Sequence, residues 1–250
     1  MNEKSSLKSI HSESNIDNSA FIDDFTVIGK GVKIGADVYI SKGVKIYGET
    51  EIGESTYIGE NCIIGHPNRK ELNWAIKNKK SLSEFTNELT VIGKNCTIRA
   101  GSIIYTNVVI GDNCQTGHNI MVREKTRIGQ HCLVGTASII DGNVDIGNDV
   151  SIQTGVYIPL FSKIKDNVFM GPYSKLTNDK YVMRKRFDLV GPDIEEFVSL
   201  GANSVIMPGI NLKPKTIVGA GAVVTKDTEE SDIVVGVPAK RLKKVPDEWM

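Results

Sequence analysis

An isoleucine recurs every six residues through the first quarter of this 250-residue chain. The positions are Ile10, Ile16, Ile22, Ile28, Ile34, Ile40, Ile46, Ile52, Ile58 and Ile64. A helix repeats its faces every 3.6 residues and a strand alternates every two, so neither requires the same residue at every sixth position. A fixed short period indicates a chain built from a repeated structural unit.

The same phase returns twice, and we call all of its residues the rungs. The later rungs are Ile92, Ile98, Ile104, Ile110, Thr116, Val122, Ile128, Val134, Ile140, Ile146, Ile152, Ile158, Ile164, Met170 and Leu176, then Leu200, Ile206, Leu212, Val218 and Val224. The residue two before each rung is small or modestly apolar, and a glycine often follows the rung. A short strand that points both residues inward and then turns explains this pattern. We expect these glycines to adopt positive φ.

This hexapeptide repeat resembles that of the left-handed parallel β-helix acyltransferases over nearly the whole chain. The resemblance implies an all-β fold in which three hexapeptides make one triangular coil and the coils stack as parallel sheets. The number of rungs then gives about ten coils. The rungs form the folding core, and we read none of them as catalytic.

Two interruptions of the repeat divide the chain. We expect an N-terminal lead-in over 1–9, the β-helix over 10–232 with insertions at about 66–90 and 177–193, and a C-terminal tail over 233–250. The spacing of Leu72, Ala75 and Ile76 predicts a short helix near 69–79. Five full coils separate the rungs that precede the insertions, so both should leave from one corner of the triangle. Long loops on a rigid scaffold usually carry function, although surface decoration is the alternative.

Composition excludes several classes of protein. The formal net charge is zero, which gives no footprint for nucleic acid or an anionic membrane. A polar start and the lack of a long apolar run favour a cytoplasmic protein. Each cysteine stands two residues before a rung, without a zinc-type CxxC spacing, so we expect buried, reduced thiols at Cys62, Cys96, Cys114 and Cys132.

We call the whole series of rungs the ladder. Its hydrophobic pattern is weakest at Thr116, a polar rung within GDNCQTGHNIMVRE. Departures from a consistent pattern are where function is expected. His118 lies two residues after this polar rung, at a turn, so its side chain should project outward. Acyl transfer to an amine or hydroxyl needs a base, and imidazole can accept a proton at neutral pH. In the acyltransferases that the chain resembles, such a histidine is the base at a cleft between two subunits; a structural histidine capping a turn is the alternative.

A γ-class carbonic anhydrase shares the expected fold and binds zinc through three histidines. The histidines here are His11, His66, His118 and His131, and their spacing does not give that pattern. No metal is therefore expected.

Steps of eighteen residues place His118, Thr136, Thr154 and Pro172 on one edge, with small residues beside them. The resemblance implies that coenzyme A runs along this edge from the histidine towards the C-terminal coils. The segments VGAGAVVTKD and IVVGVPAKRLKK are similar to the C-terminal signature of the family, with Val237 where an asparagine is usual. Cofactor-binding residues implied in this way are Gly135, Thr136, Thr154, Gly219, Ala220 and Lys226, although glycines also serve plain turns.

Two segments resemble the nucleotide-sugar N-acyltransferases, which acylate an amino group on a nucleotide-linked deoxysugar. They are IRAGSIIYTNVVIGDNCQTGHNIMVRE and KLTNDKY, the latter followed by Val182 where a proline is common. Guanidinium groups suit a diphosphate, which makes Arg99, Arg123, Arg184 and Arg186 candidates. The other substrate-binding candidates are Gln115, Asn119, Glu124, Asn178, Asp179 and Tyr181, although charged residues on turns are often only solvated.

The sequence therefore predicts a homotrimer that transfers an acyl group from acetyl-CoA, or another acyl-CoA, to a nucleotide-diphosphate aminosugar. His118 is the expected general base, and no nucleic acid or membrane partner is expected. Two alternatives remain open. One is an acetyltransferase for a small hydroxyl or amino metabolite, of the serine or tetrahydrodipicolinate type. The other is a non-catalytic β-helix scaffold subunit.

Overall fold

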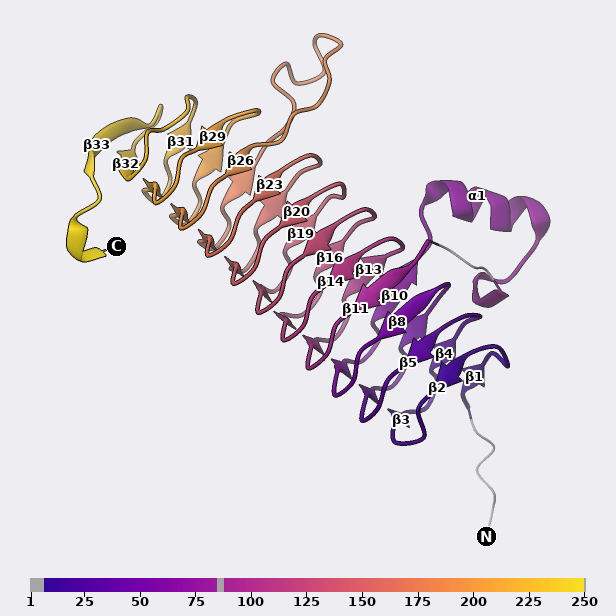
Figure 1. Ribbon diagram of the computed structural model, residues 1–250. Helices are drawn as coiled ribbons and strands as arrows, with labels where there is room; N and C mark the ends of the chain where they lie inside the picture. Colours follow the sequence, from indigo (N-terminus) through magenta and orange to yellow (C-terminus); the bar gives the residue numbers. More distant parts are fainter. Residues whose placement is uncertain (1–6, 85–87, 250) are drawn as a thin grey trace. The chain divides into compact units, whose positions relative to one another are not determined.

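The computed structural model describes residues 7–84 and 88–249. The chain divides into two compact units, Met1–Lys125 and Thr126–Met250, which we call the first and second unit. Each is a parallel β-solenoid whose short strands follow one another around three sheets (Figure 1). The all-β parallel solenoid predicted from the ladder is confirmed, and it is consistent with a left-handed β-helix.

In the first unit, neighbouring strands of a sheet belong to successive coils. Its first sheet contains β1 (Ser9–Ile10), β4 (Val27–Ile28), β7 (Lys45–Ile46), β10 (Ile63–His66), β13 (Ile103–Tyr105) and β16 (Met121–Val122). Its second sheet contains β2 (Asn15–Ile16), β5 (Lys33–Ile34), β8 (Thr50–Ile52), β11 (Thr90–Ile92) and β14 (Val109–Ile110). Its third sheet contains β3 (Phe21–Ile22), β6 (Tyr39–Ile40), β9 (Tyr57–Ile58), β12 (Thr97–Ile98) and β15 (Gln115–Thr116).

The second unit repeats this arrangement. Its first sheet contains β19 (Ile139–Ile140), β22 (Tyr157–Ile158), β25 (Lys175–Leu176), β28 (Val205–Ile206) and β31 (Val223–Val224). Its second sheet contains β17 (Arg127–Ile128), β20 (Asp145–Ile146), β23 (Lys163–Ile164), β26 (Asp193–Ile194) and β29 (Asn211–Leu212). Its third sheet contains β18 (Leu133–Val134), β21 (Ser151–Ile152), β24 (Phe169–Met170), β27 (Ser199–Leu200), β30 (Ile217–Val218), β32 (Asp232–Val235) and β33 (Lys240–Lys244).

The second unit ends with a change of direction. Strand β32 pairs in parallel with β30, whereas β33 folds back to pair antiparallel with β32. A 3-10 turn, η2 (Asp247–Trp249), follows. Counted in the described residues, the strands make slightly more coils than the roughly ten that the ladder predicts.

The rungs form the core, as predicted. Ile10, on the first described strand, is 47% exposed, whereas Ile22 is 8% and Ile28 is 1% exposed. Burial of the rungs therefore increases from the first coil into the stack. Each buried isoleucine stabilises the fold by about 1.5–3 kcal/mol before ordering entropy is subtracted. The four cysteines are also buried and not disulfide-bonded, as expected, and burial raises the pKa of the Cys62 thiol to about 11.

The glycines that follow rungs act differently from our expectation. Of those described, only Gly65 has positive φ, so the prediction of left-handed backbone at these positions is wrong. The reason for glycine is close approach: a Cβ on Gly53 would lie 2.6 Å from the backbone carbonyl carbon of Gly93 in the next coil. Positive φ occurs two residues later, as at Ser55 (56°) and Asn95 (53°).

The first insertion separates β10 from β11 and contains the helix predicted near 69–79. This helix, α1 (Arg69–Asn78), stands off the coils of the first unit (Figure 1). A capping box starts it: the Asn68 side chain accepts from the Lys70 and Glu71 amides, and the Glu71 carboxylate accepts from the Asn68 amide at 2.6 Å. The left-handed Lys79 ends it, and a 3-10 turn, η1 (Leu82–Glu84), follows.

Candidate functional site

The corners of each unit are numbered by the sheet that they follow. In the first unit, the first insertion leaves from the first corner, after β10, whereas His118 lies at the third corner, between β15 and β16. The side chain of His118 is exposed, in agreement with the outward projection expected from its place after the rung. The helical insertion and the candidate base are therefore at different corners of this unit.

The polar rung Thr116 is bonded to Arg99 of the preceding coil. Its buried hydroxyl Oγ1 accepts from the Arg99 amide at 2.9 Å, and its carbonyl accepts from Arg99 Nη1 at 3.0 Å. The Arg99 carbonyl accepts in turn from Ser102 Oγ at 2.6 Å and from Cys62 Sγ at 3.2 Å. The break in the ladder thus fixes an arginine, and its guanidinium lies against the peptide that follows Thr116.

That peptide is one residue from His118, so the third corner combines an imidazole with a fixed positive charge. Asn119 also belongs to this corner, where its amide donates to the Ala100 carbonyl at 3.0 Å. The Asn119 carboxamide occupies the space that a Cβ on Gly101 would fill. Gln115 is exposed on the outer face of β15. Four of the predicted site residues therefore share one corner: Arg99, Gln115, His118 and Asn119.

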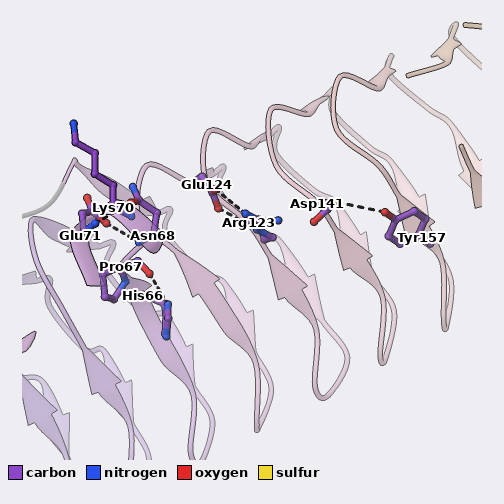
Figure 2. A network of polar contacts seen from close by, with 9 residues as sticks. All are labelled: His66, Pro67, Asn68, Lys70, Glu71, Arg123, Glu124, Asp141 and Tyr157. Carbon is purple, nitrogen blue, oxygen red and sulfur yellow. Dashed lines mark hydrogen bonds and ion pairs between the residues drawn. The ribbon is translucent and has the colours of Figure 1, made fainter. Parts of the chain in front are cut away.

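Arg123 and Glu124 lie elsewhere, at the first corner of this unit, after β16. Arg123 makes a bidentate ion pair with Glu124, with Nη2 to Oε1 at 2.9 Å and Nε to Oε2 at 3.2 Å (Figure 2). The guanidinium lies 5.7 Å from the centre of the Tyr105 ring. The structure therefore separates this pair from His118, and the Glu124 carboxylate already neutralises the arginine.

Sequence reasoning missed two further members of the first corner, His66 and Tyr105. Their rings lie 4.7 Å apart, and His66 Nδ1 is 2.8 Å from the Pro67 carbonyl (Figure 2 shows the latter contact). Burial lowers the pKa of His66, which favours the neutral imidazole. Burial also raises the pKa of Glu71, and the carboxylate of Glu124 adds to that effect. The eighteen-residue step from Tyr105 to Arg123, which places both on the same side of successive coils, could have identified Tyr105. His66 could not be found in this way, because the insertion that starts there interrupts the repeat.

The third corner of the second unit holds most of the predicted coenzyme A residues. Thr136, Thr154 and Pro172 follow β18, β21 and β24, strands of one sheet. The edge is not bare, however, because the Tyr173 ring covers Gly155: a Cβ there would lie 2.5 Å from Tyr173 Cδ1. An extended ligand on this edge would therefore meet an aromatic ring.

The predicted glycines on this edge have different causes. A Cβ on Gly135 would overlap the backbone of Gln153, so stacking of the coils alone explains that glycine. Gly219 and the exposed Ala220 follow β30, and a Cβ on the neighbouring Gly221 would meet nothing within 4 Å. A Cβ on Gly219 would lie 2.8 Å from Val235 Cγ1, so the open part of this edge is at Ala220 and Gly221.

Lys226 does not belong to that edge. It follows β31, a strand of the first sheet, and lines a cavity of about 310 Å³ between that corner and β33. Its assignment beside Gly219 and Ala220 came from a sequence signature that spans two corners.

The second insertion brings several predicted substrate residues together. Asn178 Nδ2 donates to the Leu160 carbonyl at 3.2 Å, which anchors the loop. The Asp179 carboxylate accepts from the amides of Tyr181 and Met183, both at 2.9 Å. A cavity of about 600 Å³ is lined by Asp179, Lys185, Arg186 and Phe187 among others. The exposed Arg184 lies in the same loop, and Tyr181 packs edge-on against Phe187.

Two further properties of the chain concern metal binding and membrane insertion. Over the described ranges, 7–84 and 88–249, no group of three or more His, Cys, Asp or Glu residues could hold a metal ion. Among the helices of that same part of the chain, none combines the length and apolar character needed to cross a bilayer.

Family models match the chain in three parts. The model described as GMPPB C-terminal domain matches residues 6–99. The bacterial transferase hexapeptide model (six repeats) matches 89–119, which contains the third-corner residues of the first unit. The model for the hexapeptide repeat of succinyl-transferase matches 125–159 and 193–226.

Curated relatives match shorter segments. An inferred acetyltransferase of Schizosaccharomyces pombe is 31% identical over 91 residues, 34% of this chain and 44% of the relative. A 2,3,4,5-tetrahydropyridine-2,6-dicarboxylate N-acetyltransferase of Staphylococcus aureus is 43% identical over 54 residues, 22% of this chain and 23% of the relative. The chain thus spans less than half the length of these relatives.

Two solved structures resemble the fold. A UDP-N-acetylglucosamine acyltransferase has a TM-score of 0.52 at 18% identity, covering 95% of this chain and 72% of the other. The enzyme of that name from Bacteroides fragilis has a TM-score of 0.50 at 18% identity, covering 96% and 74%. At such low identity, the likeness is one of fold alone.

Proposed function

We propose that this chain, a member of the hexapeptide-repeat transferases, transfers an acyl group from acetyl-CoA, or another acyl-CoA, to the amino group of a nucleotide-diphosphate-linked amino-deoxysugar. One observation carries the proposal. The exposed His118 is two residues from Thr116, whose carbonyl accepts from the Arg99 guanidinium. This corner lies within the matched transferase segment 89–119.

The chemistry follows from the groups at that corner. The acyl-CoA supplies an activated acyl group as a thioester. As the sugar amine attacks the thioester carbonyl, His118 accepts the proton of the amine, directly or through water. The Arg99 guanidinium, fixed by the Thr116 carbonyl, provides positive charge for the oxyanion that forms. When the C–S bond breaks, His118 returns its proton to the departing thiolate.

The remaining candidates are assigned to the two substrates. We assign Thr154, Gly219 and Ala220 to coenzyme A, together with Thr136, because they share the third corner of the second unit. We assign Asn178, Asp179, Tyr181, Arg184 and Arg186 to the acceptor, because one loop carries them and two of them line its cavity. A homotrimer, in which a second copy completes the cleft, remains part of the proposal through the family resemblance.

A smaller acceptor is the second candidate. The 43% identity to the Staphylococcus aureus tetrahydropyridine-dicarboxylate N-acetyltransferase favours it, although the match covers only 54 residues. In this case the basic loop residues would face a dicarboxylate instead of a diphosphate.

The test is thiol release from acetyl-CoA with a panel of acceptors: uridine and thymidine diphosphate aminosugars, tetrahydrodipicolinate, serine, and water alone. Because the four cysteines are buried, the native protein should add little background to a thiol reagent. We expect release with at least one aminosugar nucleotide and an acylated sugar by mass spectrometry. Release only with a small metabolite would favour the second candidate. No release with any acceptor, together with no thermal stabilisation by coenzyme A, would favour the scaffold.

A further inference from the structure

The C-terminal segment of the second unit and the third sheet enclose a cavity of about 360 Å³. Its floor includes Ser199 of β27 and Ile217 of β30, which are register partners in the sheet. Asn167, Phe197, Lys215 and Trp249 surround this floor. All of these residues lie outside the corner assigned to acyl transfer, and a volume of this size suits a small ligand.

The C-terminal segment is held in place over this floor. Val245 is only 6% exposed, and its amide donates to the Ser231 carbonyl at 2.8 Å. The Trp249 amide donates to the Pro246 carbonyl at 3.0 Å, which closes η2. The Trp249 indole lines the cavity and yet is 61% exposed, with Lys243 Nζ 5.6 Å from its ring. One wall is therefore a large ring that the fold itself does not bury.

Phe197 forms another part of the wall, at a left-handed turn position that recurs along the solenoid. It has φ of 58° and is 55% exposed, and the corresponding positions in the neighbouring coils are Asn167 and Lys215. Left-handed backbone suits Asn far better than a bulky aromatic residue. An exposed phenylalanine at this turn gains little for the core, so its ring is available for a ligand.

The polar groups of the cavity indicate the class of that ligand. Among the described lining residues, Lys215 carries the only charged side chain, and Asn167 offers an amide that can both donate and accept. Aromatic rings bind planar bases by stacking, and a lysine binds phosphate as a point charge. Together these groups match a nucleobase that carries phosphate.

We propose that this cavity, defined by Asn167, Phe197, Lys215, Ile217 and Trp249, binds the base and phosphate of a nucleotide. The choice of occupant rests on the proposed function, in which both substrates are nucleotides: coenzyme A ends in adenosine 3′,5′-bisphosphate, and the acceptor carries a nucleoside diphosphate. Both sources present a base that can stack on the aromatic rings and a phosphate that can bind the lysine.

The test is calorimetric titration of the full chain with adenosine 3′,5′-bisphosphate, dTDP and UDP, each alone. We expect one of them to bind, and Phe197→Asn to weaken that binding at least about tenfold through loss of stacking. Lys215→Gln should lower the affinity for the phosphorylated ligand and leave the affinity for the bare nucleoside unchanged. Tighter binding of the bisphosphate identifies coenzyme A as the source, whereas tighter binding of dTDP or UDP identifies the acceptor.

Phe161→Asn is the matched control, because Phe161 is also 48% exposed with φ of 68° but lies outside this cavity. Both substitutions place asparagine where left-handed backbone favours it, so both variants should fold. Equal binding by the Phe197 and Phe161 variants, or no nucleotide binding at all, would overturn the proposal. Acyl transfer is measured separately: transfer with unaltered nucleotide affinity in Phe197→Asn refutes only the cavity, and cavity binding without transfer refutes only the proposed function.

Discussion

The first and third corners of the first unit contain similar side chains in different states. At the first corner, His66 contacts Tyr105, Tyr105 lies under Arg123, and Arg123 is paired with Glu124. At the third corner, the bonds from Arg99 and Thr116 hold the turn, and the His118 side chain is exposed. A polar cluster that is satisfied internally stabilises a fold, whereas a histidine exposed beside a fixed cation can act on a ligand. We therefore infer that the first corner stabilises the fold and that the third corner carries out acyl transfer.

The largest stability effect should follow from removing the ring at the centre of the first corner. Tyr105→Ala loses the contacts with both His66 and Arg123, and we expect it to lower the free energy of unfolding by about 1–3 kcal/mol, because the ring is half-buried. Tyr105→Phe keeps the ring and should cost much less. Denaturant unfolding of both variants tests this, and equal losses would show that the hydroxyl, rather than the ring, matters.

At the third corner, Thr116→Val should affect both stability and turnover. Loss of the hydroxyl leaves the Arg99 amide without its acceptor, which we expect to cost about 1–2 kcal/mol. The Thr116 carbonyl still accepts from the Arg99 guanidinium, so kcat should fall only as far as the freed Arg99 backbone shifts that group. Thr116→Ser keeps the acceptor and serves as the control. If the valine variant keeps full activity, the Thr116 hydroxyl does not position Arg99 for the reaction.

The ion pair at the first corner gives a smaller effect. Arg123 and Glu124 are partly exposed, so a double-mutant cycle with Arg123→Gln and Glu124→Gln should give a coupling of about 0–1 kcal/mol. The sequence predicted a diphosphate site here, whereas the structure pairs the two residues with each other. We expect KM for the acceptor to change less than about threefold in Arg123→Gln. A tenfold rise in KM would restore the predicted role.

The smallest effect concerns the thiol beneath the third corner. Burial raises the pKa of Cys62 to about 11 from its ordinary value of 9.0, so the folded state holds this proton more tightly than the unfolded state. Its contribution to stability is therefore present below about pH 9 and lost as the pH rises towards 11. At pH 8 the native protein should not react with a thiol reagent, whereas the unfolded chain should. Rapid native labelling at Cys62 would show that this corner opens.

The period of the ladder was enough to predict the solenoid, its inward residues and the buried cysteines, because a repeat with one dominant spacing allows few folds. It also predicted the outward direction of His118. It could not predict which polar residues bond to one another, as Arg123 does to Glu124 and Arg99 to Thr116. It also attributed the glycines after the rungs to backbone angle, whereas the distance between coils requires them. Contacts of this kind depend on three-dimensional packing that a period does not contain.

The most direct test compares three histidine variants in one assay: His118→Ala, His66→Ala and His131→Ala, the last a control for an exposed histidine in the second unit. We expect kcat/KM for acyl transfer to fall by about 10²–10⁴ in His118→Ala, as for loss of a general base, and to change less than about threefold in the other two. Each folded variant should keep the oligomeric state of the wild type. Full activity in His118→Ala, or a greater loss in His66→Ala, would contradict the assignment of chemistry to the third corner.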